Sequence, residues 1–141
     1  MIQEDFVSFE TAKLLKEKEF DETCRSFWKV WDKHTTLCDC SPSHMFEYCH
    51  NSMLEKYNDE EELNIAAPTL QMAMKWLREK HNIAISVYVF NRDLPIKEGE
   101  ISYTCDIATP FISSKEGHLR LVGSYEKACE EAIKYCLENL I

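Results

Sequence analysis

The chain has 141 residues, the length of about one domain, and folding at this size should bury roughly two thirds of the unfolded surface. Its 25 acidic residues outnumber the 16 basic ones, and the formal net charge of −9 disfavours binding to nucleic-acid phosphates and anionic membrane surfaces. The apolar fraction of 45%, with only 3 glycines and 4 prolines, excludes a largely disordered chain. We therefore expect one folded domain over residues 1–141.

The N-terminal residues MIQEDFVSFE are acidic where a signal peptide would be basic, and no apolar segment follows them. No window approaches the roughly 18 apolar residues that a membrane-spanning helix needs. The 7 cysteines are an odd number and come without a secretion signal, so we expect reduced thiols. These features predict a cytoplasmic protein without a membrane segment.

The first half of the chain predicts one helix and two strands. Ser8 is expected to cap a helix over about 9–20, because its hydroxyl can accept a hydrogen bond from an amide of the first turn. The segment CRSFWKVWDK, residues 24–33, carries aromatic side chains at both alternating positions and predicts a strand with two partly buried faces. A second strand is expected over 45–49. The polar and acidic residues 51–66 are expected to form a loop that can include one helical turn.

The second half predicts a helix, two or three strands and a final helix. The segment APTLQMAMKWLREKHN places apolar residues three and four apart, and Pro68 suits the helix start. Residues 83–91 are rich in β-branched and aromatic side chains and predict a buried strand. We expect an antiparallel partner within 101–111, a short strand over 118–122, and a helix that begins at Ser124.

The predicted order is α-β-β-α-β-β-(β)-α. The expected strands within each group are joined by short turns and not by helical crossovers, which indicates antiparallel pairing. We therefore expect the α+β class, with about three helices packed on one face of an antiparallel sheet.

The segment LCDCSPSHMFEYCH, residues 37–50, is rich in residues that can bind a metal ion. Zinc pairs are usually spaced C-x2-4-C, whereas one residue separates Cys38 from Cys40, so an extended chain would hold their sulfurs about 6–7 Å apart. A turn at Pro42 would be needed to bring the ligands together. The zinc hypothesis names Cys38, Cys40, His44 and Cys49 as ligands. The simpler interpretation is a loop and strand with free thiols.

No segment carries a catalytic or phosphate-binding motif. The chain lacks G-x-S-x-G, H-E-x-x-H, Walker-type and G-x-G-x-x-G sequences. The carboxylate runs 60–62 and 130–131 lie in charged segments and are expected to face solvent. The sequence therefore names no catalytic residue and no cofactor other than the zinc of that hypothesis.

Three segments resemble a family of short uncharacterised proteins encoded by gut-dwelling anaerobic bacteria, their prophages and related mobile elements. They are EDFVSFETAKLLKEKEFDETCRSFW, APTLQMAMKWLREKHNI and SYEKACEEAIKYCLENLI, which together cover somewhat more than half of the chain. The resemblance implies an α+β fold and a cytoplasmic setting in a bacterial or phage-infected cell. It implies no catalytic or binding residue, and no shared cysteine–histidine pattern over residues 37–50.

These observations favour a small non-catalytic protein that binds another protein or a second copy of itself. Trp28 and Trp31, on a strand that is expected to be exposed, are the candidate partner-binding residues, because aromatic side chains anchor many interfaces. One alternative is an acidic decoy that occupies nucleic-acid-binding proteins, which requires strips of carboxylates at phosphate spacing. The other alternative is a zinc-stabilised binding module built on residues 38–50.

Overall fold

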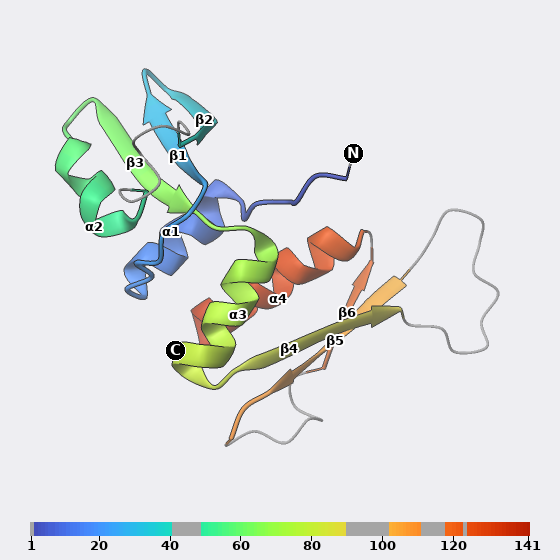
Figure 1. Cartoon of the computed structure of the whole chain (residues 1–141). Helices are drawn as coiled ribbons and strands as arrows, with labels where there is room; N and C mark the ends of the chain where they lie inside the picture. The colour runs from blue at the N-terminus through green and yellow to red at the C-terminus, as the bar shows by residue number, and fades with distance from the viewer. Residues whose placement is uncertain (1, 41–48, 90–101, 111–117, 123) are drawn as a thin grey trace. The chain divides into compact units, whose positions relative to one another are not determined.

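The fold is described from a computed structural model of the chain, which describes residues 2–40, 49–89, 102–110, 118–122 and 124–141 (Figure 1). The chain divides into two compact units, Met1–Thr69 and Leu70–Ile141. The prediction of a single domain over residues 1–141 stays a prediction. Among the described residues, no helix is both long enough and apolar enough to cross a membrane.

The first unit contains a three-stranded antiparallel sheet and short helices. Its elements, in chain order, are α1 (Phe9–Glu17), β1 (Ser26–Trp31), β2 (His34–Asp39), α2 (Asn51–Leu54), the 3-10 helix η1 (Glu55–Tyr57) and β3 (Glu62–Ala67). The strand order is β2-β1-β3, so β1 is central and β2 and β3 are the edges. Both α1 and α2 contact β3.

Local signals explain how α1 begins and ends. The Ser8 hydroxyl accepts a hydrogen bond from the Thr11 amide, as predicted, at 3.2 Å. The helix ends three residues earlier than expected, because Glu19 adopts a left-handed conformation with φ of 66°. That turn lets the Phe20 amide donate to the Leu15 carbonyl, and it buries the Phe20 side chain in the core.

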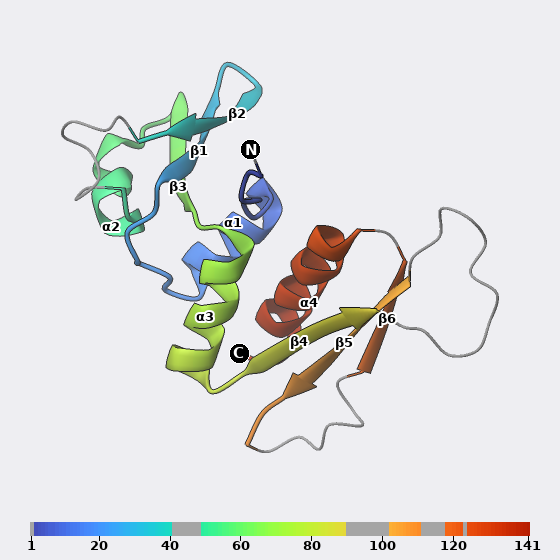
Figure 2. The ribbon, with the colours of Figure 1, turned by 45° about the vertical axis from the view of Figure 1, so that its right-hand side comes forward.

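The second unit contains a second three-stranded antiparallel sheet with two helices. Its elements are α3 (Leu70–His81), β4 (Ala84–Val89), β5 (Ser102–Ala108), β6 (His118–Val122) and α4 (Tyr125–Asn139). The strand order is β4-β5-β6. The helices α3 and α4 lie side by side on one face of this sheet (Figures 1 and 2). Trp76, Leu77, Ile107, Ile133 and Leu137 are buried there.

The α+β class and the antiparallel pairing are confirmed, but the strands form two sheets and not one. The loop with one helical turn that was expected over residues 51–66 is wrong where β3 lies, at Glu62–Ala67, while the short helices α2 and η1 occupy its first half. A strand that the sequence did not predict as the partner of β1 lies at His34–Asp39. Of the strand expected over 45–49, residues 45–48 fall outside the described residues and Cys49 lies in no strand. The strand β3 was missed because it is short and directly follows an acidic segment. Its extended conformation depends on pairing with β1, which a local pattern does not show.

Candidate functional site

The β1–β2 hairpin determines where the two predicted tryptophans lie. Asp32 and Lys33 form its two-residue turn with φ of 47° and 64°, the positive values that such hairpin turns require. Trp28 and Trp31 differ by three positions in one strand, so their side chains lie on opposite faces of the sheet. Trp31, at the end of the hairpin, has 57% of its surface exposed. The two candidate anchors therefore do not share one binding surface.

Trp28 is a structural residue as well as a surface residue. Its indole Nε1–H donates to the Val7 carbonyl at 3.0 Å, and the Phe9 ring lies edge-on to the indole at a centroid distance of 6.4 Å. These contacts place the segment before α1 against the Trp28 face of the sheet. Trp28 remains half-buried and not fully covered.

A groove of about 820 Å³ lies on the Trp28 face of the sheet. The β1–β2 hairpin contributes Ser26, Trp28, Leu37 and Asp39 to its lining, and the Ser26 hydroxyl donates a hydrogen bond to the Asp39 carboxylate at 3.0 Å. The remaining lining residues come from the N-terminal segment and from the residue before β1: Ile2, Gln3, Glu4, Asp5, Phe6 and Arg25. The groove therefore combines apolar side chains with charged ones that are mainly acidic.

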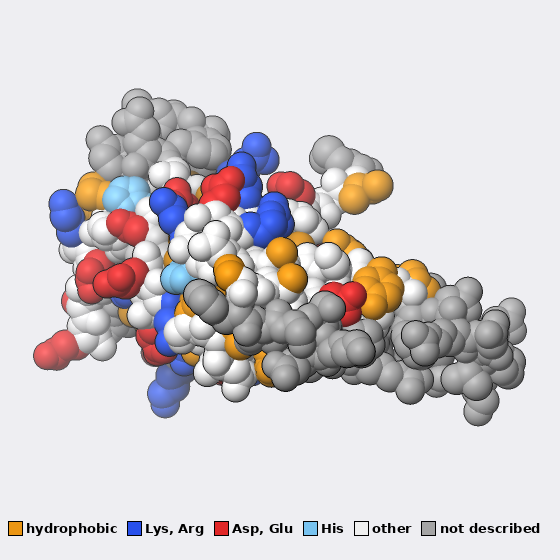
Figure 3. Space-filling view, turned by 90° about the horizontal axis from the view of Figure 1, so that it is seen from below, with side chains coloured by type: hydrophobic (Ala, Val, Ile, Leu, Met, Phe, Trp, Pro, Cys, Tyr) orange, Lys and Arg blue, Asp and Glu red, His pale blue; other side chains and the backbone are white. Residues whose placement is uncertain are grey.

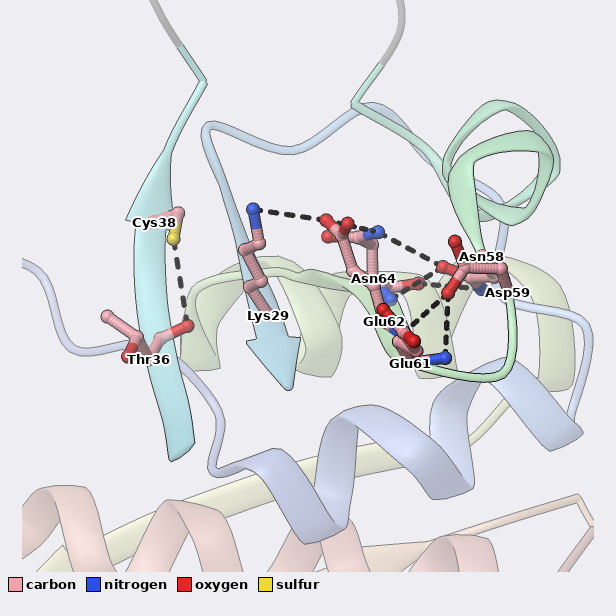
Figure 4. Close-up of polar contacts among 8 residues, drawn as sticks. All are labelled: Lys29, Thr36, Cys38, Asn58, Asp59, Glu61, Glu62 and Asn64. Atoms are coloured by element: carbon pink, nitrogen blue, oxygen red, sulfur yellow. Dashed lines mark hydrogen bonds and ion pairs between the residues drawn. The ribbon is translucent and has the colours of Figure 1, made fainter. Parts of the chain in front are cut away.

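The opposite face of this sheet, which carries Trp31, also carries a cluster of polar side chains that bond to one another (Figure 4). Lys29 Nζ lies 3.1 Å from the Glu62 carboxylate, and the Asn64 amide group donates to the same carboxylate at 3.3 Å. The Asp59 carboxylate accepts hydrogen bonds from the backbone amides of Glu61 and Glu62, at 2.8 Å each. This cluster is accounted for by its internal bonds, which hold the turn before β3.

The outer edge of β3 is covered by side chains from α2 and from the residue after η1. The Asn51 side chain accepts from the Ala66 amide at 2.9 Å and donates to the Phe20 carbonyl at 2.7 Å. The Asn58 side chain accepts from the Asn64 amide at 2.6 Å and donates to the Asn64 carbonyl at 3.3 Å. Two asparagines thus replace the neighbouring strand that this edge lacks.

The outer edge of β2 has no comparable cover among the described residues. The backbone amides of Asn64 and Ala66 in β3 point away from β1. Backbone groups alternate in direction along each antiparallel strand, so the registers of β3 with β1 and of β1 with β2 show which groups of β2 point outward. They are the backbone groups of Thr35, Leu37 and Asp39. The bond from the Cys40 amide to the Arg25 carbonyl, at 2.8 Å, fits this register. The residues with outward backbone groups are those whose side chains lie on the groove face.

Two of the four ligands in the zinc hypothesis, Cys40 and Cys49, form a disulfide in the structure, with their Cα atoms 6.5 Å apart. In this form neither sulfur is a thiolate, and a thiolate is the form that binds zinc. Cys38 is half-exposed and its thiol is directed to the Thr36 carbonyl at 3.8 Å, while His44 lies outside the described residues (Figure 4). Among the described residues, no group of three or more metal-binding side chains is gathered.

The expectation that all thiols are reduced is therefore wrong for Cys40 and Cys49. Disulfides are rare in cytosolic proteins, so the disulfide gives no support to the predicted cytoplasmic location, which stays a prediction. The other thiols are structural for the most part. Burial raises the pKa of Cys24 and of Cys136 to about 12, so both thiols stay protonated and unreactive at neutral pH.

The acidic decoy requires continuous strips of carboxylates. On the face that Figure 3 shows, the acidic side chains of the described residues lie among lysines and arginines. This mixed pattern does not favour the decoy over a protein-binding function.

Sequence reasoning selected Trp28 but missed the rest of the groove. In the sequence, Leu37 is the first residue of a cysteine-rich segment, and no local pattern links it to Glu4 and Asp5. The usable signal was the segment WDKHTT, in which a turn pair separates two β-forming segments. No family model, no curated protein and no solved structure matches this chain.

Proposed function

We propose that this chain is a small non-catalytic protein of phage or mobile-element type that acts by binding another protein. The observation that supports it most is the groove on the Trp28 face, which lies beside the edge of β2 that no described residue covers. Apolar and charged side chains in one groove, next to backbone groups that have no partner among the described residues, supply the contacts that protein recognition uses. The three-segment resemblance given above supports the phage or mobile-element origin.

Capture from a lysate of the organism that carries the gene tests this function, provided that capture is tied to the groove. Leu37→Ser removes an exposed apolar side chain from the groove, and Tyr57→Ser removes one from η1, outside the groove. We expect wild type and Tyr57→Ser to retain the same protein, and Leu37→Ser to lose it, as measured by quantitative mass spectrometry of the eluates. Equal capture by all three chains, or capture by none, contradicts the proposal.

A further inference from the structure

We infer that β2 binds an extended, basic peptide segment as an added antiparallel strand. In this arrangement, a cationic side chain of the segment faces Asp39 and an apolar side chain faces Leu37. This inference rests on the proposed function and names the chemistry of its partner. Three independent features of the first unit support it: the backbone of β2, the charge of the groove, and the spacing of its side chains.

The outer edge of β2 has backbone groups that can pair with an added strand. Among the described residues, β2 pairs with β1 on one side only, and its outward groups belong to Thr35, Leu37 and Asp39. An uncovered edge of this kind is a template for another strand, and proteins usually protect it with lysine, proline or a covering segment. The sequence HTTLCD contains neither lysine nor proline. The other edge of the same sheet is covered by Asn51 and Asn58.

The charge of the groove selects a basic occupant. Glu4, Asp5 and Asp39 line it against one cation, Arg25, and the described residues show no ion pair between these groups. Asp39 is held in place by the hydrogen bond from Ser26. A second copy of the chain would bring its own net charge of −9 to this wall, whereas a cationic segment gains from it. Charge complementarity therefore favours a basic partner over self-association.

The spacing of the groove residues predicts a sequence pattern in the partner. Side chains two apart in a strand share one face, so Leu37 and Asp39 face two positions that are also two apart in the added strand. An antiparallel strand runs in the reverse direction, so the residue facing Asp39 comes first. The expected pattern is a lysine or arginine, one residue of any kind, and then a valine, leucine or isoleucine. The groove volume, about 820 Å³, is within the range of protein ligand sites.

The test uses the synthetic peptide Thr-Lys-Thr-Val-Thr-Lys-Thr, acetylated and amidated at its ends, with the full-length chain. A control peptide carries glutamate in place of both lysines. We expect the lysine peptide to shift the NMR amide signals of Thr35, Leu37 and Asp39, and to bind with a Kd that rises with salt concentration because the contacts are ionic. The glutamate peptide should cause no such shifts.

Two variants and a matched control assign the contacts. Asp39→Asn keeps an acceptor for the Ser26 hydroxyl but removes the charge, and we expect it to raise the Kd about tenfold, the effect of losing one charge-assisted contact. Leu37→Ser should raise the Kd by a similar factor. Glu61→Gln changes the net charge by the same amount outside the groove and should leave the Kd unchanged.

The outcomes separate this inference from the proposed function. Binding of the glutamate peptide with equal Kd, or NMR shifts confined to residues outside β2 and the groove, overturns the basic-strand inference. Absence of binding to either peptide, together with Leu37-dependent capture from lysate, also overturns it and leaves the proposed function standing. If the wild-type chain is a dimer and the Leu37→Ser variant is a monomer, the occupant of the β2 edge is a second copy of the chain, and the basic-strand inference is overturned.

Discussion

Glu19 is one of four non-glycine residues with positive φ among the described residues, and it lies where α1 ends. Its left-handed conformation allows the Glu19 amide to donate to the Lys16 carbonyl and the Phe20 amide to donate to the Leu15 carbonyl. These paired bonds form the usual helix-terminating motif in which glycine is preferred. A side chain with a Cβ atom is strained in this conformation.

Glu19→Gly should therefore stabilise the first unit, because glycine adopts positive φ without the Cβ clash. The expected gain in the free energy of unfolding is about 1 kcal/mol, measured by urea denaturation. Glu19→Ala removes the same charge but keeps the Cβ atom, so it serves as the control and should show no comparable gain. An equal gain from alanine would trace the effect to charge and not to backbone conformation.

The helix α2 is capped by Asp21, which lies 31 residues before Ser52 in the sequence. The Asp21 carboxylate accepts hydrogen bonds from the Ser52 amide at 2.7 Å and from the Ser52 hydroxyl, and His50 Nδ1 lies 3.1 Å away. Burial alone would raise the pKa of Asp21, but the hydrogen bonds from Ser52 and the nearby His50 outweigh it and lower the pKa. The helix has only 4 residues, and His50 at its N-cap forms no side-chain capping bond. Asp21 supplies that bond.

The lowered pKa fixes the sign of a pH dependence. A carboxyl whose pKa is lower in the folded chain stabilises the fold above its unfolded pKa of about 3.9, and the contribution is lost as pH falls through the folded pKa. Asp21→Asn should therefore lower the midpoint of thermal unfolding at neutral pH, and the difference from wild type should shrink below pH about 4. Glu22→Gln, on the neighbouring residue, is the control. A difference that stays constant down to acidic pH would contradict this role.

At the scale of the whole molecule, the Cys40–Cys49 disulfide constrains the unfolded chain. The two residues are 9 positions apart, and a loop of this length corresponds to about 2–3 kcal/mol of stability in the chain-entropy description. Reductant should lower the free energy of unfolding of wild type by about this amount. The double variant Cys40→Ser, Cys49→Ser should start at the lower value and show no response to reductant.

Cys38→Ser is the matched control, since it removes a half-exposed thiol that lies outside the disulfide. It should keep the response to reductant. Identical unfolding curves of wild type with and without reductant would show that Cys40 and Cys49 are thiols, and would return the zinc hypothesis to consideration with Cys38, Cys40, His44 and Cys49 as its ligands.

Local patterns predicted those elements whose conformation depends on neighbouring residues. The predicted N-cap Ser8 is confirmed, since capping involves residues three positions apart, and the helix expected to begin at Ser124 begins one residue later, with Ser124 as its N-cap. The β-branched and aromatic content of residues 83–91 predicted β4, and the flanking glycines Gly117 and Gly123 predicted β6. The helix α3 was found from its apolar spacing.

The sequence alone determined the α+β class, the antiparallel pairing, the acidic charge and the main helices, because each of these depends on composition or on short-range periodicity. Tertiary structure decided the rest. Pairing with β1 made β3 a strand, and the approach of Cys40 to Cys49 made a disulfide where free thiols were expected. The tertiary structure also places Glu4 and Asp5 in the same groove as Leu37 and Asp39. Such contacts join residues far apart in the chain, and their free energy depends on a geometry that no local pattern encodes.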